Sequence, residues 1–413
     1  MSWYRDAVDR VSGSDSEQPP APGKVAEFAR FLRTETVGGT LLLVATAIAL
    51  IWANSPVGDA YIALRDYRIG PAAIGLDLTV GTWAKDGLLA IFFFVIGLEL
   101  KRELVIGELN DRKTATLPAV AALGGMLVPA GLALAVSWGA PGFSQAWAIP
   151  VATDIAFALG VLALTGSGLP SSLRIFLLSL AVVDDLGAIL VIALLFTSGF
   201  QILAFAASIA LGGLYWLLQQ QRIRSSWLYV PIALLTWYAV HESGIHATIA
   251  GVALGLLTRV HSDEGEAEPP ALRLEHRLQP YSAGVAVPVF ALFAAGVPIG
   301  AGALADIATD RVAIGVIVGL LVGKLIGILG FSWLAVTIKL AVKPRLLEWR
   351  DIAAVAMLGG VGFTVSLLIA ELSLTGDAAE RAKAAVLLAS AAASLIAAVA
   401  LLQRGRAHQN QNG

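Results

Sequence analysis

Cysteine is absent from this chain, and its absence excludes disulfides, thiolate nucleophiles and cysteine-ligated metals. Histidine is scarce, and its five residues are scattered, so no histidine-rich metal cage is predicted. The formal net charge of −2 provides no basic face for nucleic acid. We therefore expect no cofactor and no nucleic-acid partner.

Charged residues are also few. They make up 14% of the chain, against about 25% in soluble domains, while 57% of residues are hydrophobic and the mean hydropathy is +0.77. This composition is typical of an all-α polytopic membrane protein, so we expect the lipid bilayer to surround it. Twelve apolar stretches are long enough to span about 30 Å. They lie at about 37–53, 83–100, 115–137, 147–165, 173–198, 200–219, 227–241, 243–258, 281–298, 311–337, 351–373 and 382–403.

Lysine and arginine alternate between the connections that join these twelve stretches. If both termini are cytoplasmic, the inside connections contain about four times as many lysines and arginines as the outside connections. The division we expect is therefore a flexible cytoplasmic arm at 1–36, a transmembrane domain at 37–403 and a short cytoplasmic tail at 404–413. The arm lacks an apolar signal core next to Met1, so it is not a cleaved leader.

Two connections carry further signals. Residues 67–82 have a Gly-Pro turn between short alternating runs, which indicates either a β-hairpin whose edge could pair with a second copy or a plain loop. Residues 259–280 include an acidic, proline-bearing run, which predicts a solvated cytoplasmic loop.

Two adjacent carboxylates, Asp184 and Asp185, interrupt the apolar run 181–194. Burying one ionised carboxylate in hydrocarbon costs several kcal/mol or more unless it is paired, hydrated or protonated. Such residues in a membrane helix favour an ion or proton path. Because neighbours on a helix lie about 100° apart, the two cannot face one cavity equally, and one of them could be structural.

Other polar residues are predicted to lie at the same depth. A rise of about 1.5 Å per residue places Asp154, Asp185, Lys324 and Thr364 in the middle third of a ~30 Å slab. Opposite charges at one level are expected to share a low-dielectric site. Alone, however, Lys324 could be a structural partner of one carboxylate.

Two of the predicted helices also contain interruptions. The fourth has Ile149-Pro150-Val151-Ala152-Thr153-Asp154, and the eleventh has Gly359-Gly360-Val361-Gly362-Phe363-Thr364. Interrupted helices expose carbonyls and half-helix dipoles that can hold a cation. Because the two helices run in opposite directions, helices 3–5 and 10–12 would form an inverted repeat. The alternative for the glycines is close packing of helices.

Several motifs, in order, resemble the NhaA-type sodium/proton antiporters over about residues 25–405, and inverted repeats with broken helices are a known feature of that family. The motifs are Phe94 to Leu104 (FVIGLELKREL), Ala148 to Val161 (AIPVATDIAFALGV), Asp184 to Ile189 (DDLGAI), Ser243 to Thr248 (SGIHAT), Arg273 to His276 (RLEH), Gly323-Lys324 and Gly362-Phe363-Thr364.

The resemblance implies roles for the central residues. Asp185 and Asp154, the latter with Thr153, would line the Na⁺ site, and Asp184 would pair with Lys324. One of these groups would carry a proton.

The resemblance also implies roles nearer the two faces. Glu99 and Glu275 would lie at a cytoplasmic funnel that senses pH, His246 would take part in the pH response, and Asp86 would lie near the outer end. From the residues alone, Glu99 could instead reach interfacial water, and His246 could be an interhelical hydrogen-bonder. The hairpin match implies a homodimer.

The sequence departs from the family pattern at three places. Leu325 follows Lys324 where proline is common, Ala294 lies in a stretch that lacks an expected asparagine, and Gln279 replaces a usual histidine. These departures affect the expected pH set-point and kinetics.

The expected function is therefore secondary transport. Cytoplasmic Na⁺ or Li⁺ would be exchanged for external H⁺ in a bacterial inner membrane, electrogenically and under pH control, for pH and sodium homeostasis. The protein would not be an enzyme. The main alternative is a sodium-coupled organic-solute symporter of similar architecture. An intramembrane aspartyl protease is disfavoured because Asp184 lacks a Gly-x-Gly-Asp context.

Overall fold

The computed structural model describes residues 35–412, apart from 167, 198, 224, 264, 265 and 267, and almost all of its regular structure is helical. The predicted arm therefore lies outside the described residues, except for its last two positions. The α-helices are α3 (Glu35–Ala53), α4 (Gly58–Asp66), α5 (Val80–Thr82), α6 (Leu89–Val105), α7 (Arg112–Ser137), α8 (Phe143–Ala146), α9 (Ile155–Thr165), α10 (Ser171–Leu195), α11 (Ile202–Gln220), α12 (Ser226–Glu242), α13 (Thr248–Leu257), α14 (Pro270–Tyr281), α15 (Val287–Ala294), α16 (Ala301–Thr309), α17 (Arg311–Val318), α18 (Lys324–Thr337), α19 (Trp349–Leu358), α20 (Phe363–Ser373) and α21 (Gly376–Asn412).

Short segments of other geometry connect several of these helices. Three are π-helical, namely Trp83–Leu88, Ser282–Ala286 and Gly319–Gly323. Three are 3₁₀ turns, namely Ala72–Ile74, Glu108–Asn110 and Ile149–Val151. The π-helical segments continue into α6, α15 and α18, so these helices are longer than their α-helical bounds.

Within the described residues, six helical runs are long and apolar enough to cross a membrane. They are Lys113–Ser137, Phe143–Thr165, Ser171–Leu195, Ile202–Gln220, Arg311–Thr337 and Gly376–Asn410. Two bent pairs raise the number to eight: α3 with α4, bent by 115°, and α19 with α20, bent by 48°. The chain is therefore a multi-pass, all-α membrane protein.

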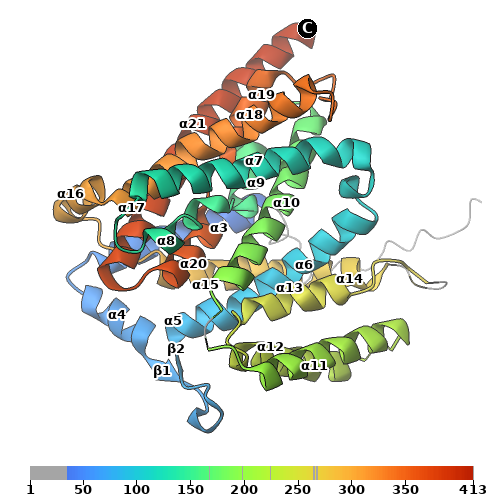
Figure 1. Ribbon diagram of the computed structural model, residues 1–413, viewed down its shortest axis with the longest axis vertical. Helices are drawn as coiled ribbons and strands as arrows, with labels where there is room; N and C mark the ends of the chain where they lie inside the picture. The colour runs from blue at the N-terminus through green and yellow to red at the C-terminus, as the bar shows by residue number, and fades with distance from the viewer. Residues whose placement is uncertain are drawn as a thin grey trace, which may run out of the picture.

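Figure 1 shows how the helices are grouped. Helices α7, α17 and α18 run side by side, and α21 extends along the same part of the molecule to the C-terminus. Helices α6, α13 and α14 form a second group, with α11 and α12 paired at its outer edge. The apolar core lies between the groups and includes α20, α15 and the middle of α21.

Glycine brings two helix pairs into backbone contact. A Cβ added at Gly251 would lie 2.2 Å from the carbonyl oxygen of Ala90, and one at Gly255 would lie 2.7 Å from the Cα of Gly97. Helices α6 and α13 therefore touch through their main chains, the packing that small residues permit in membranes. The pair α7 and α18 repeats this arrangement, because a Cβ at Gly327 would lie 2.1 Å from the carbonyl oxygen of Gly124.

Two segments that were predicted as a loop and a tail contain helix in the structure. The predicted loop 259–280 is helical from Pro270 onward, because proline at the first helical position favours initiation and Ala271 and Leu274 pack against Leu98 of α6. The predicted tail 404–413 is helical as far as Asn412, as a continuation of α21. Helix α21 continues through Asn412, because no proline or glycine interrupts residues 406–412.

The hairpin signal at 67–82 corresponds to a very short pair of strands. Strand β1 (Arg68–Ile69) pairs antiparallel with β2 (Leu78–Thr79), with Arg68 opposite Thr79 and Ile69 opposite Leu78. Gly70 adopts φ 129° where the first strand ends, a conformation that favours glycine. At the other end, the side chain of Thr79 caps α5 and ends the pairing.

Candidate ion-binding site

The two interrupted stretches meet and are hydrogen-bonded to each other. The backbone N–H of Asp154 donates to the carbonyl of Val361 at 2.6 Å. The hydroxyl of Thr153 donates to the carbonyl of Gly359 at 2.9 Å. Backbone groups left unpaired by each break are thus satisfied by the other, which is how irregular backbone is tolerated at membrane depth.

Asp154 lies at the N-terminal ends of two half-helices. One carboxylate oxygen caps α9 by accepting the N–H of Phe157 at 3.0 Å. The other accepts the N–H of Thr364 at 3.1 Å and its hydroxyl at 2.7 Å, at the start of α20. Helix N-termini carry partial positive charge, so both dipoles stabilise this buried carboxylate. Three donors therefore hold Asp154 in one orientation.

Lys324 and Asp184 form a buried ion pair beside this crossing. The Lys324 Nζ lies 2.6 Å from Oδ2 of Asp184, and the two side chains are 0% and 1% exposed. The same ammonium donates to the carbonyl of Val151 at 2.5 Å and to the hydroxyl of Thr153 at 3.0 Å. An ammonium has three donors, so this one is fully used, and a carbonyl at the end of a helical turn complements its charge.

The carboxylate of Asp185 is buried and has spare acceptor capacity. The residue is 4% exposed, and among the described residues its Oδ1 has no hydrogen-bond partner. The same holds for Oδ1 of Asp184, whose other oxygen pairs with Lys324. Helix α10 therefore brings Asp184 to the ammonium, while each of the two adjacent carboxylates keeps one oxygen without a donor among the described residues.

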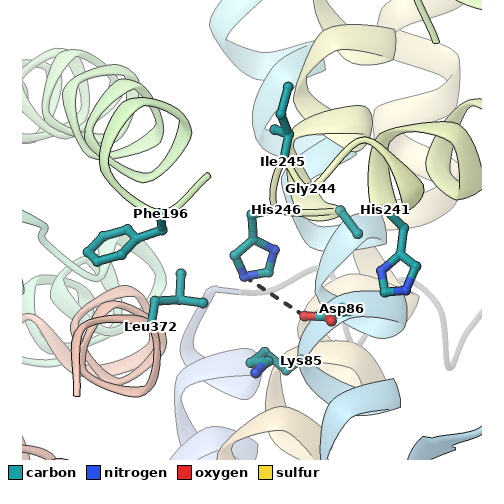
Figure 2. Close-up of a pocket in the computed structure, with 9 residues that line it drawn as sticks. Lys85, Asp86, Phe196, His241, Gly244, Ile245, His246 and Leu372 are labelled. Atoms are coloured by element: carbon teal, nitrogen blue, oxygen red, sulfur yellow. Dashed lines mark ion pairs between the residues drawn. The ribbon is translucent and has the colours of Figure 1, made fainter. Parts of the chain in front are cut away.

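Asp86, predicted for the outer side, and His246, predicted for the pH response, lie close together. Oδ1 of Asp86 and Nε2 of His246 lie 3.8 Å apart, and neither atom has a hydrogen-bond partner within the described chain. They line a pocket of about 200 Å³ together with Lys85, Phe196, His241, Gly244, Ile245, Ala247 and Leu372. Figure 2 shows the His246 ring facing Asp86, with Phe196 and Leu372 on the other side of the ring. The pocket thus adjoins the ends of α10 and α20, two helices of the central site.

Glu275, predicted for the cytoplasmic funnel, has a partner that the sequence did not reveal. The Arg102 guanidinium donates from one nitrogen to both carboxylate oxygens of Glu275, at 2.6 and 2.8 Å. Burial raises the pKa of Glu275, and Arg102 opposes part of that rise. The sequence contains no local signal for this pair, because its two partners are 173 positions apart. Glu99 lies on α6 one turn before Arg102 and is half-buried.

The stretch 359–364 has both features considered from the sequence, namely exposed backbone groups and close packing of helices. The carbonyl of Gly359 accepts the Thr153 hydroxyl, and α20 begins directly after Gly362. Close packing occurs too, because a Cβ at Gly360 would lie 2.5 Å from the carbonyl oxygen of Leu320. Sequence reasoning missed the carbonyls of Val151 and Val361, since main-chain ligands have no residue signature.

Buried carboxylates, a buried ammonium and two hydrogen-bonded helix breaks define a class of protein. These are secondary ion transporters, in which discontinuous helices hold charge near the middle of the membrane.

The comparisons with known proteins agree with this class. The sequence profile of the family described as "Na+/H+ antiporter 1" matches residues 29–401. Antiporter NhaA 1 of Saccharopolyspora erythraea is 69% identical over 384 residues, which cover 93% of each chain. Antiporter NhaA 2 of Rhodococcus jostii is 62% identical over 387 residues, covering 93% of this chain and 94% of the relative. The chain belongs to the Na⁺/H⁺ antiporter family of the NhaA type.

Proposed function

We propose that this chain exchanges Na⁺ for H⁺ at one carboxylate site that is presented alternately to the two faces of the membrane. The observation that carries the proposal is the buried cluster of Asp154, Asp184, Asp185 and Lys324 at the crossing of two helix breaks. Relatives named Na⁺/H⁺ antiporters, up to 69% identical, support the same activity.

The two carboxylates that would line the Na⁺ site have different tasks. Asp185 has an oxygen without a donor among the described residues, so it can take either a sodium ion or a proton. Asp154 would contribute to the Na⁺ site while its donors fix its position, and Thr153 would add its oxygen. Because each occupant neutralises the same charge, binding of one displaces the other, and alternate exposure converts that competition into exchange.

Lys324 and Asp184 supply the remaining charge compensation. A lysine that releases its proton when Asp185 becomes charged, and regains it afterwards, would add a second exchanged proton. Two protons against one sodium ion make the exchange electrogenic. The three donors on the Lys324 ammonium link its protonation to Thr153 and Val151 at the break, which supports this coupling.

The proposal includes the membrane topology of the chain and the direction of transport. Twelve membrane helices with N- and C-termini in the cytoplasm would contain inverted repeats of helices 3–5 and 10–12 within the domain 37–403. Cytoplasmic Na⁺ or Li⁺ would leave against external H⁺ across a bacterial inner membrane, in pH and sodium homeostasis. Glu99, Glu275 and His246 would adjust the response to pH, and Asp86 would lie on the outer path.

We also propose that the β1–β2 hairpin pairs with that of a second copy. Both residues of β1 are exposed, and the edge is short and carries Arg68. The unpaired backbone groups of an exposed edge can add a second strand, while a short, charged edge restricts that pairing to a matched partner such as the same hairpin. Crosslinking of single cysteines introduced near the hairpin tip tests this, because the cysteine-free chain gives no background.

The decisive experiment uses purified protein in sealed proteoliposomes with a proton gradient. Addition of NaCl should dissipate the gradient, and Asp185→Asn should abolish the response while leaving the protein monodisperse. Asp377→Asn, an exposed acid at the start of α21, is the matched control and should retain exchange. Sodium-dependent proton movement in Asp185→Asn would contradict the assignment.

The alternative function is sodium-coupled uptake of an organic solute. The same liposomes separate the two, because a symporter needs its solute to move sodium, whereas an antiporter responds to sodium alone. The central polar groups are engaged with one another at hydrogen-bond distance, which favours a small inorganic ion over an organic solute.

A further inference from the structure

Helix α21 contacts the interrupted pair α19–α20 at three levels. Near its outer end Lys383, which is buried, pairs with Glu371 of α20 at 3.5 Å. In the middle, the Ser390 hydroxyl accepts the N–H of Phe363, the first residue after the break, at 3.2 Å. Lys383 and Arg404 are 21 residues apart, which is about 31 Å of helix and matches the ~30 Å hydrocarbon thickness.

The third level is a cluster of charges at the start of α19. Arg404 Nε donates to Oδ1 of Asp351 at 2.7 Å, and its Nη2 donates to Glu348 at 2.7 Å. His408 Nε2 lies 3.1 Å from the other Asp351 oxygen. Asp351 is fully buried and also accepts the backbone N–H of Glu348 in a capping box. We call Asp351, Glu348, Arg404 and His408 the cytoplasmic latch.

The latch is connected to the ion site by a short rigid path. Helix α19 runs for ten residues from Trp349 to Leu358, and the next residue, Gly359, supplies the carbonyl that holds Thr153. A Cβ added at Gly360 would lie 3.4 Å from the Cβ of Ala393 on α21, so α21 also contacts the break itself. A shift of α19 along its axis therefore moves a carbonyl that orients the site.

We propose that the Arg404–Asp351 ion pair positions α19 against α21 and thereby sets the geometry of the sodium site. Arg404 and Asp351 are positioning residues, since neither touches the central carboxylates. The pair is suited to this task because a bidentate guanidinium on two acidic partners fixes both distance and angle. Lysine could keep the charge at position 404 but not the forked contact. The inference rests on the proposed exchange at the helix crossing.

The test measures sodium-dependent exchange in proteoliposomes as a function of Na⁺ concentration. Arg404→Gln should raise the half-saturating Na⁺ concentration by about fivefold or more, with a smaller change in the rate at saturating Na⁺. Arg404→Lys should recover part of the loss. Arg406→Gln, two residues further along α21 and exposed, is the matched control and should match the unmodified protein.

Two further variants keep the proposal open to refutation. Asp351→Asn preserves side-chain shape and should also raise the half-saturating concentration, while Arg404→Gln/Asp351→Asn should cost no more than the larger single effect. Size-exclusion profiles confirm folding of each variant. If Arg404→Gln folds and its half-saturating Na⁺ concentration is unchanged, while Asp185→Asn is inactive, the positioning role of the latch is wrong and the proposed exchange site stands. Retained exchange in Asp185→Asn would overturn the proposed site instead.

Discussion

The ammonium of Lys324 lies 2.6 Å from the carboxylate of Asp184, and both side chains are sealed from solvent. Such a pair does not by itself stabilise a fold, because desolvation of the two charges offsets much of their attraction. Charge compensation during the proposed exchange would give this pair a function.

Removing only the lysine should be costly. Lys324→Met leaves Asp184 as an uncompensated buried charge, for which we expect a loss of about 3–5 kcal/mol unless the carboxylate takes a proton. The thermal midpoint in detergent should fall, and the exchange that remains should lose its electrogenicity. Measurements of membrane potential during sodium-driven exchange check the second point.

The double variant Lys324→Met/Asp184→Leu gives the matching control for stability. Replacing both partners with apolar side chains of similar size removes the unpaired charge, so the midpoint should recover most of the single-variant loss. If exchange by Lys324→Met moves charge as the unmodified protein does, then lysine is not the second proton carrier.

The contact of Thr364 with Asp154 should tune sodium affinity. Thr364→Val removes the hydroxyl that donates to the carboxylate at 2.7 Å but retains the backbone donor. Hydrogen bonds to charged groups contribute about 1.5–3 kcal/mol, so the half-saturating Na⁺ concentration should change by roughly tenfold or more. Thr364→Ser keeps the hydroxyl and should behave as the unmodified protein. Equal behaviour of the valine and serine variants would refute this role.

The contact between α6 and α13 should tolerate no added methyl group. Gly255→Ala places a Cβ 2.7 Å from atoms of Gly97, and overpacking of this kind costs about 1–3 kcal/mol. We expect a lower thermal midpoint and reduced yield. Gly213→Ala on α11 is the control, because a Cβ there meets nothing within 4 Å and alanine favours helix.

The raised pKa of Glu275 gives a pH dependence whose sign can be worked out. The folded state holds this proton more tightly than the unfolded chain, so the stabilisation from protonated Glu275 is complete below the ordinary value near 4.5 and is lost as pH rises through the raised folded value. Glu275→Gln keeps a neutral side chain throughout. The thermal midpoint of the unmodified protein should therefore fall relative to Glu275→Gln as pH rises through that window. A gap that stays constant between pH 4 and pH 8, or moves the other way, contradicts the assignment.

Much of the fold could be predicted from the sequence because the bilayer imposes a simple rule. Each apolar stretch of about 20 residues must satisfy its own backbone, so hydropathy locates helices such as α7 and α10. Helix ends were less accessible. The helical part of α14 depends on packing against α6, and neither it nor the extension of α21 has the hydropathy that marks a membrane span.

The candidate site was predictable as far as it consists of unusual side chains. Asp154, Asp184, Asp185 and Lys324 are conspicuous because charge in an apolar run is expensive. Partners joined over long sequence separations were not predictable, such as Arg102 with Glu275 or Arg404 with Asp351. Backbone ligands were equally hidden, because every residue has the same carbonyl.

The hydrogen bond from the Asp154 N–H to the Val361 carbonyl has a consequence for how the site can vary. No exchange of one side chain for another removes a main-chain donor and acceptor, proline at position 154 excepted. Side-chain substitutions around the crossing can therefore alter sodium affinity and exchange rate while this hydrogen bond between the two breaks remains. Apart from proline at position 154, only a change to the backbone itself, such as an ester in place of the amide at Asp154, removes this hydrogen bond.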